Sequence, residues 1–243
     1  MKDKVVLITG GAKRVGAEVV RHLHALGYRV VVHTRHSSAE PLLNELNAKR
    51  KDSAVSLQAD LSDMKAIERL AQDALKIFGR IDALVNNASS FYPTPVGKID
   101  EAVWDDLMNI NAKAPLFLTQ ALAGELKKNQ GAVVNMVDIH VERPLKDFHV
   151  YSMSKAALEM LTKTLARALA PDVRVNAVAP GIILWGESEK DFSEEKKAQM
   201  IKRVPLQRQG EAKDIAETIA FLLQQKYING QIIAVDGGRR LAV

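Results

Sequence analysis

Short apolar runs rich in β-branched residues recur along the whole chain, and most of them are separated by segments with helical periodicity. Strands that alternate with helices are typical of a parallel sheet covered on both faces. We therefore expect an α/β fold with a Rossmann-like, doubly wound, seven-stranded parallel sheet and helices on both faces. The runs span residues 4–9, 29–33, 54–58, 81–86, 132–137, 173–178 and 231–236.

The length and composition favour one domain over residues 1–243. With 47% hydrophobic residues the chain can bury one substantial core, and 243 residues leave little room for a second domain. It contains no cysteine, which excludes disulfides and thiolate metal sites. The first apolar run is too short for a signal peptide or a membrane span, and no later segment approaches about 18 apolar residues. We therefore expect a cytoplasmic protein without a membrane partner.

The charge pattern argues against a nucleic-acid partner. The net charge is +5 and the pI is 9.3, but lysines and arginines are scattered among nearly as many acids and form no stripe interleaved with aromatics. Binding of a small anionic cofactor explains the excess of positive charge equally well. The six histidines show no spacing with carboxylates that indicates a metal site, so we expect no metal.

The segment after the first run, 16-GAEVVRHLHALG-27, predicts a helix that ends at Gly27. Its apolar residues fall along one helical stripe: Val19, Val20, Leu23 and Leu26. The segment 63-DMKAIERLAQDALKIFG-79 has the same pattern.

The loop 9-TGGAKRVG-16 lies between the first run and this helix. Glycines there allow backbone N–H groups to approach a pyrophosphate at the positive end of the helix, a role that fits Gly10, Gly11 and Gly16. Alone the signal is weak, since such a turn is often no more than a tight connection. It predicts a dinucleotide site only with support from the rest of the chain.

The end of the second run, 33-HTRHSS-38, indicates which dinucleotide. NAD-selective loops tend to place an acid there for the ribose hydroxyls, whereas this chain has none before Glu40. Arg35 with Ser37, aided by His36 and Lys13, can bind a 2′-phosphate, which favours NADP(H). The alternative is that these are solvated loop cations.

The stretch 151-YSMSK-155 places Tyr151 and Lys155 on one helical face. An ammonium near a phenol favours the phenolate, so the tyrosine can pass a proton near neutral pH. The same spacing also occurs by chance on ordinary amphipathic helices.

Taken in order, the TGxxxxxG loop, 86-NNAS, Asn111 in 109-NINAKAP, 151-YSMSK and 180-PG resemble the short-chain dehydrogenase/reductases, and the likeness extends to 235-VDGG. The resemblance implies that Tyr151 donates the proton, Lys155 holds the nicotinamide ribose and lowers the tyrosine pKa, Asn111 supports a relay water, and Asp60 meets the adenine. The cofactor contacts that it implies are Gly10, Lys13, Arg14, Val15, Arg35, His36, Ser37, Asp60, Leu61, Asn87, Ala88, Ser89, Tyr151, Lys155, Pro180 and Gly181.

Two positions depart from the general pattern of that family. Asp138 stands where the family usually has a serine, 13 residues before the tyrosine, and Arg14 replaces the second loop glycine. A carboxylate would repel a developing alkoxide, which makes carbonyl reduction less natural and suits a substrate with ring nitrogens that need protons.

Both departures are shared by the pteridine reductase branch, which 87-NASSFYPTPV also resembles. In that branch the phenylalanine at Phe91 stacks on the pterin against the nicotinamide. The resemblance implies that the substrate contacts are Arg14, Ser89, Phe91, Asp138, Phe148 and Tyr151. Without this resemblance, the alternatives are that Phe91 anchors a loop in the core and that Asp138 caps the end of a strand. The segments 182-IILWGESEKDF and 141-VER resemble the bacterial dihydromonapterin reductases more closely.

The resulting hypothesis is an NADPH-dependent pteridine reductase that acts on dihydropterins, with folates and oxidised pterins as further candidates. The alternatives are a 3-oxoacyl-carrier-protein or other keto reductase and a non-catalytic NADPH-binding regulator. The resemblance also implies a homotetramer that packs the helices around 105–127 and 151–169.

Overall fold

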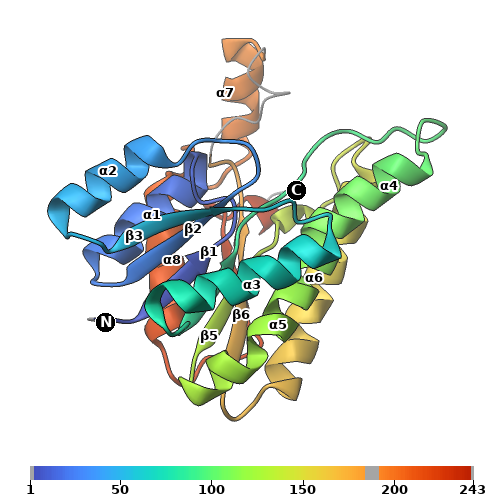
Figure 1. Cartoon of the computed structure of the whole chain (residues 1–243). Coiled ribbons are helices and arrows are strands. Elements are labelled where there is room, and N and C mark those ends of the chain that lie inside the picture. Colours follow the sequence, from blue (N-terminus) through green and yellow to red (C-terminus); the bar gives the residue numbers. More distant parts are fainter. Residues whose placement is uncertain (1–2, 184–191, 242–243) are drawn as a thin grey trace.

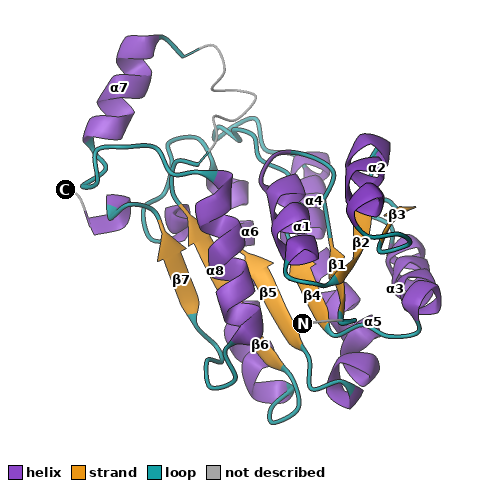
Figure 2. Ribbon diagram, turned by 90° about the vertical axis from the view of Figure 1, so that its left-hand side faces the viewer, coloured by secondary structure: helices purple, strands orange, loops and turns teal. Residues whose placement is uncertain are grey.

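A computed structural model describes residues 3–183 and 192–241, and these form one α/β domain. A single parallel sheet of seven strands runs through it in the order β3-β2-β1-β4-β5-β6-β7 (Figure 2). All seven predicted runs form strands, which confirms the expected fold. The strands are β1 (Val5–Ile8), β2 (Arg29–Thr34), β3 (Ala54–Gln58), β4 (Ala83–Asn86), β5 (Ala132–Met136), β6 (Arg174–Pro180) and β7 (Ile232–Val235).

The helices cover both faces of the sheet (Figure 1). On one face α1, α2 and α8 enclose a core that includes Val20, Leu42 and Ile219, and on the other α3, α5 and α6 enclose a core that includes Ile67 and Leu118. The α-helices are α1 (Arg14–Ala25), α2 (Glu40–Lys49), α3 (Met64–Phe78), α4 (Glu101–Met108), α5 (Ala114–Lys128), α6 (His149–Ala168), α7 (Glu194–Lys202) and α8 (Ala212–Gln224), and a π-helix (Asn109–Lys113) joins α4 to α5.

The sequences of the central strands are almost continuously apolar because both faces of these strands are buried. Every residue of β1 and β4 is buried, and so is every residue of β5. The neighbours β1 and β4 lie where the strand order reverses, since β2 and β3 extend the sheet on one side and β5 to β7 on the other. At such a switch point the loops diverge and leave a crevice at the carboxyl ends of the strands.

The first helix begins two residues earlier than its sequence pattern predicts and ends at Ala25. Val19, Val20 and Leu23 are fully buried, as expected. The prediction for Leu26 is wrong, because this residue lies beyond the last helical turn and its side chain is 38% exposed.

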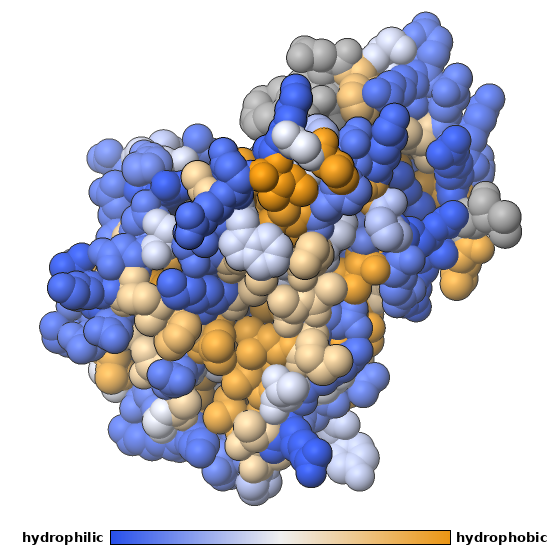
Figure 3. Space-filling view, turned by 90° about the vertical axis from the view of Figure 1, so that its right-hand side faces the viewer, coloured by the Kyte–Doolittle hydropathy of each residue, from blue (hydrophilic) through white to orange (hydrophobic). Residues whose placement is uncertain are grey.

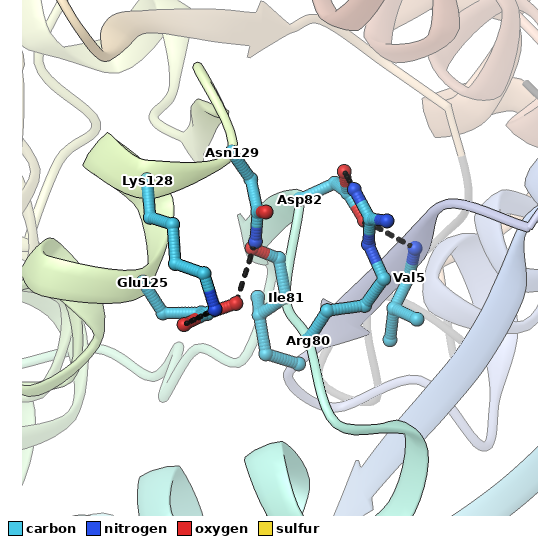
Figure 4. A network of polar contacts seen from close by, with 7 residues as sticks. All are labelled: Val5, Arg80, Ile81, Asp82, Glu125, Lys128 and Asn129. Carbon is cyan, nitrogen blue, oxygen red and sulfur yellow. Dashed lines mark hydrogen bonds and ion pairs between the residues drawn. The ribbon is translucent and has the colours of Figure 1, made fainter.

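A polar network closes the opposite end of the sheet, at the amino ends of β1 and β4 (Figure 4). The buried carboxylate of Asp82 accepts a hydrogen bond from the backbone N of Val5 at 2.8 Å. Arg80 donates to both carboxylate oxygens, at 2.9 and 2.7 Å. Beside this cluster, the side-chain amide of Asn129 donates to the carbonyl of Ile81 at 2.9 Å. These bonds tie β1, β4 and α5 together on the side away from the crevice.

Candidate active site

A cavity of about 670 Å³ opens at the carboxyl ends of the strands. Its walls come from the segments that follow all seven strands, together with parts of α1, α6 and α7. This is the crevice that the reversal in strand order creates. Of the predicted site residues, those lining it are Gly10, Lys13, Arg14, Val15, Arg35, His36, Ser37, Leu61, Asn87, Ala88, Ser89, Phe91, Asp138, Tyr151, Lys155, Pro180 and Gly181.

The glycine loop after β1 is held in place by its neighbours. Gly10 has φ +62°, and a Cβ added there would lie 3.0 Å from the Cα of Ala88. The side-chain amide of Asn87 donates to the carbonyls of Thr9 and Gly10, at 2.9 and 3.0 Å. A Cβ on Gly16 would overlap the Gly10 carbonyl, so both positions require glycine. Sequence reasoning missed the role of Thr9, whose hydroxyl accepts from two backbone N–H groups of the β4 loop.

The predicted phosphate role of Gly11 is wrong. Its backbone N donates to the carbonyl of His33 at 3.1 Å, and a Cβ there would touch Val20 and Val32 at 3.0 Å. Gly11 therefore allows α1 to pack closely on β2, and it does not line the cavity. The start of α1 does face the cavity, through Lys13, Arg14 and Val15.

Arg14 begins α1 with a φ of +54°, in the left-handed region that normally favours glycine. A side chain other than glycine costs about 1–2 kcal/mol in this conformation. The sequence therefore keeps a strained backbone at the position where it departs from a glycine. Such strain at a cavity wall points to a function for the guanidinium.

At the end of β2, Arg35 forms an ion pair with Asp60 across 3.1 Å. Asp60 also accepts hydrogen bonds from the backbone N and hydroxyl of Ser62, which, with Arg35, lower its pKa. Arg35, His36 and Ser37 line the cavity, whereas Asp60 does not. The structure therefore places Asp60 as the partner of Arg35, and its contact with the adenine stays a prediction.

His33 also lines this end of the cavity and was not predicted to take part. Its Nδ1 accepts from the backbone N of Gly10 at 3.2 Å, and its Nε2 donates to the carbonyl of Ala59 at 3.0 Å. Burial lowers its pKa, which keeps the ring neutral and suits this arrangement. The signal in the sequence was a polar residue at the end of an otherwise apolar strand facing the glycine loop.

The hydroxyl of Tyr151 donates a hydrogen bond to Oδ2 of Asp138 at 2.5 Å. The other carboxylate oxygen accepts from the backbone N of His140 at 2.8 Å. Burial and the Asp138 carboxylate together raise the pKa of Tyr151 well above its ordinary value. The phenol is therefore held protonated, with a carboxylate in direct contact.

Lys155 is buried, and its Nζ donates to the carbonyl of Met136 at 2.8 Å. Its Nζ lies 5.8 Å from the centre of the Tyr151 ring. Burial lowers the pKa of Lys155 to about 8. The pKa of Tyr151 is raised by burial and Asp138 in this structure, and the expected lowering of that pKa by Lys155 stays a prediction.

Asn111 sits in the π-helix between α4 and α5, where its side chain is fully buried. Its amide nitrogen donates to the carbonyl of Ser90 at 3.0 Å and to the hydroxyl of Ser154 at 2.9 Å. Its amide oxygen accepts from the hydroxyl of Ser89 and the backbone N of Ser90, both at 3.0 Å. Asn111 therefore joins the β4 loop to α6, and it does not itself line the cavity.

Three aromatic rings pack against one another: Phe91, Phe148 and Tyr151. Phe91 stacks on Phe148 with ring centres 4.7 Å apart and an interplanar angle of 26°, and it meets Tyr151 edge-on at 4.8 Å. Phe91 lines the cavity, whereas Phe148 does not. The structure thus places Phe148 as a support behind Phe91. The bridge between Thr94 and Phe148 fixes the same two loops to each other.

Comparison with known proteins accounts for this arrangement. A family model described as enoyl-(acyl carrier protein) reductase matches residues 10–240. The chain belongs to the short-chain dehydrogenase/reductase family. It is therefore an oxidoreductase.

Two kinds of relative within the short-chain dehydrogenase/reductases match almost the whole chain. "Pteridine reductase 1" of Leishmania tarentolae is 36% identical, over 98% of this chain and 96% of its own. The 3-oxoacyl-[acyl-carrier-protein] reductase of Staphylococcus epidermidis is 34% identical, over 97% of this chain and 98% of its own, and that of Staphylococcus aureus is likewise 34% identical. The family and its oxidoreductase chemistry are thereby established, and the substrate is a separate question.

Several lining residues of this short-chain dehydrogenase/reductase were not predicted from the sequence. Among them are His140, Leu145, Met200 and Arg239, which belong to no recognised motif, and Ile182 and Ile183, which begin the segment that resembles the dihydromonapterin reductases. Most of the segment 182–192, which resembles the dihydromonapterin reductases, lies outside the described residues. Among the described residues, no three His, Asp or Glu side chains gather to hold a metal ion. No helix in the same residues is long and apolar enough to cross a membrane.

Proposed function

We propose that this enzyme is an NADPH-dependent pteridine reductase. It reduces a C=N bond of 7,8-dihydropterins, and of the oxidised pterins, to give tetrahydropterins. The observation that carries this proposal is the 2.5 Å hydrogen bond from Tyr151 to Asp138. A carboxylate at that place disfavours the developing negative charge of a reduced ketone and suits delivery of a proton to a ring nitrogen.

The cavity fits NADPH. Gly10 and Gly16 allow the loop after β1 to pack closely against its neighbours. The start of α1 offers backbone N–H groups and the cations Lys13 and Arg14 to a pyrophosphate. Arg35, His36 and Ser37 supply the side chains for a 2′-phosphate. Lys155 holds the nicotinamide ribose, while the β4 loop and Pro180 with Gly181 line the nicotinamide. The cofactor supplies the hydride when bound.

The side chains of this protein align the substrate and supply the proton. Tyr151, kept protonated by burial and by Asp138, donates to the ring nitrogen next to the carbon that receives the hydride. One hydride and one proton thus convert C=N to CH–NH, and the tyrosine recovers its proton through Asp138 from solvent. Asn111 acts as a positioning residue, because it fixes Ser89 and the β4 loop against α6.

The flat heteroaromatic ring of a pterin is held by stacking against Phe91, which lines the cavity and packs on Phe148. Arg14 and Ser89 offer hydrogen-bond partners to the polar edge of the ring. These contacts are specific to a planar heterocycle. A flexible acyl chain gains little from them.

Keto reduction is the second candidate, supported by the 34% identity to 3-oxoacyl-[acyl-carrier-protein] reductases. Asp138 is the residue that argues against it. An assay of NADPH oxidation with dihydrobiopterin, dihydromonapterin, dihydrofolate and a β-ketoacyl thioester separates the two. We expect turnover of the dihydropterins; turnover of the thioester alone would refute the pterin assignment. NADPH binding without turnover of any substrate would indicate the non-catalytic regulator.

We also propose a homotetramer that uses α5 and α6. Figure 3 shows apolar side chains gathered on the face that carries α4, α5 and α6. Met153 and Met160, one heptad apart on α6, are 51% and 58% exposed, and Trp104 of α4 is 39% exposed. Burial of such a face between copies is favourable. Light scattering on the purified protein gives the assembly size.

A further inference from the structure

The side chain of His140 lines the cavity but has no part in the function proposed above. It is half-buried, in the 3-10 turn Ile139–Val141 that follows β5. Its Nδ1 lies 2.8 Å from the carbonyl of Arg143. Because a carbonyl only accepts hydrogen bonds, Nδ1 carries the proton, and Nε2 of the neutral ring is an acceptor. Within the described part of the chain, Nε2 has no hydrogen-bond partner, since the contact with Arg143 engages Nδ1 alone.

The turn that carries His140 is tied to the reacting centre. The backbone N of His140 donates to one carboxylate oxygen of Asp138 at 2.8 Å, and the other oxygen accepts from the hydroxyl of Tyr151 at 2.5 Å. The backbone N of Arg143 donates to the carbonyl of Ile139 at 3.2 Å. Together with the bond at Nδ1, these contacts hold the imidazole in one orientation. A single carboxylate separates its backbone from the proposed proton donor.

The chemistry of a dihydropterin brings its substituent to the same place. In a 7,8-dihydropterin, the carbon of the reducible C=N bond also carries the substituent of the ring. Under the proposed function Tyr151 protonates the nitrogen of that bond, so the substituent begins two bonds from the atom that the tyrosine hydroxyl contacts. His140 and Leu145, both from the segment between β5 and α6, line the cavity. The substituent therefore leaves the ring beside the segment that carries His140.

We propose that His140 is a specificity-determining residue, whose Nε2 accepts a hydrogen bond from a hydroxyl group on the substituent of the substrate. This role rests on the proposed function and deepens it, because it names the side chain that distinguishes one dihydropterin from another. A site that offers a fixed hydrogen-bond acceptor discriminates against an analogue without the matching donor, since the acceptor is then left unpaired. An alkyl substituent leaves Nε2 in that state.

Two dihydropterins test this role: 7,8-dihydrobiopterin, whose substituent carries hydroxyl groups, and 6-methyl-7,8-dihydropterin, whose substituent has none. In His140→Asn the side-chain amide can still donate to the Arg143 carbonyl, but no acceptor reaches the place of Nε2. We expect kcat/KM for dihydrobiopterin to fall about three- to tenfold, mainly through KM, while that for the methyl compound stays within about twofold. Steady-state NADPH oxidation measures both. Retained turnover of the methyl compound shows that the variant is folded.

His140→Gln is the complementary variant. Its amide oxygen reaches the place of Nε2, whereas the contact with the Arg143 carbonyl is lost. We expect it to keep the ratio of the two kcat/KM values within about twofold of the ratio in the unmodified enzyme. His149→Asn is the control, because it removes an imidazole from an exposed residue at the start of α6, outside the cavity lining. It should leave the turnover of both substrates unchanged.

Two kinds of result overturn the role of His140, and they are distinguishable. If the unmodified enzyme reduces neither dihydropterin, the proposed function fails and this role fails with it. If it reduces both and His140→Asn changes their kcat/KM values equally or not at all, the function stands and the role of His140 is refuted. A ratio that falls in His140→Gln but not in His140→Asn also refutes it, because the contact with Arg143 would then be the part that matters.

Discussion

The Tyr151 hydroxyl donates to Asp138 across 2.5 Å, while the ammonium of Lys155 in the same site is engaged with the carbonyl of Met136. The proposed proton donor is thus paired with a carboxylate, whereas the ammonium donates to a backbone carbonyl. This arrangement keeps the phenol protonated and sets the expectations for Asp138.

Asp138→Asn should lower kcat for dihydropterins by about 10²-fold or more, because the amide does not return a proton to Tyr151. Asp138→Ser should raise turnover of a β-ketoacyl thioester, because it removes the charge that repels an alkoxide. Steady-state NADPH oxidation with both substrates measures this. If the serine variant gains no ketone turnover, our account of the carboxylate is refuted.

Lys155 gives stability a dependence on pH. Its folded-state pKa of about 8 lies below the ordinary 10.5, so between these values the unfolded chain holds a proton that the folded chain has released. The free energy of unfolding therefore rises between pH 8 and pH 10.5, by up to about 3 kcal/mol, and Lys155 gives no such rise below pH 8. At pH 7 the Lys155→Met variant should have a higher free energy of unfolding than the unmodified protein. This difference should be smaller at pH 9.5. Urea unfolding of both proteins measures it; a constant difference would contradict the assignment.

Arg14 offers a matched pair of variants. Arg14→Gly and Arg14→Ala both lose the guanidinium, but only glycine accepts φ +54° without strain. We expect the glycine variant to be more stable than the alanine variant by about 1 kcal/mol in thermal unfolding. Both should raise KM for the pterin more than KM for NADPH. The reverse order would make Arg14 a phosphate clamp.

Arg35→Asp should shift cofactor preference toward NADH. The new carboxylate would stand beside Asp60, and together they would repel a 2′-phosphate. We expect the ratio of kcat/KM for NADPH to that for NADH to fall at least about tenfold. Arg69→Asp, an exposed cation outside the cavity wall, is the control. An unchanged ratio in Arg35→Asp removes this residue from the cofactor site.

Asp82 lies on the far side of the sheet, so its removal should act on stability alone. Asp82→Ala leaves Arg80 and the backbone N of Val5 without their acceptor, which should cost about 2–3 kcal/mol of unfolding free energy. Asp73→Ala breaks only an exposed ion pair with Lys76 and should cost under about 0.5 kcal/mol. KM values should change in neither variant. Equal losses in the two would show that the network is no stronger than a surface pair.

Much of the fold was readable in the sequence because it depends on local patterns. The apolar runs predicted all seven strands, and the glycine at position 16 predicted the close turn before α1. The spacing of Tyr151 and Lys155 put both side chains on one face of a helix. Each of these inferences used residues whose relation is fixed by one strand, one turn or one helix, whereas Asp138 was found through the family resemblance.

The remainder depends on contacts between distant segments. Gly11 and His33 meet only because β1 and β2 pair in the sheet, and Arg143 meets Arg239 across 96 positions of the chain. The rise in the pKa of Tyr151 could not be predicted, because sequence spacing does not report burial. Leu26 was misassigned because the periodic pattern extended beyond the point where the helix ends.

The position of Asn111 depends on the number of residues in the π-helix Asn109–Lys113. Its wide turn accommodates an additional residue relative to an α-helix, and each residue of an α-helix advances by about 100°. Deletion of a single residue in 109–113 would restore an ordinary turn and change the direction in which the residues of that turn point. Asn111 would then turn away from Ser90 and Ser154 even though its identity is unchanged. A variant one residue shorter is therefore a more severe lesion for this site than most substitutions within the turn.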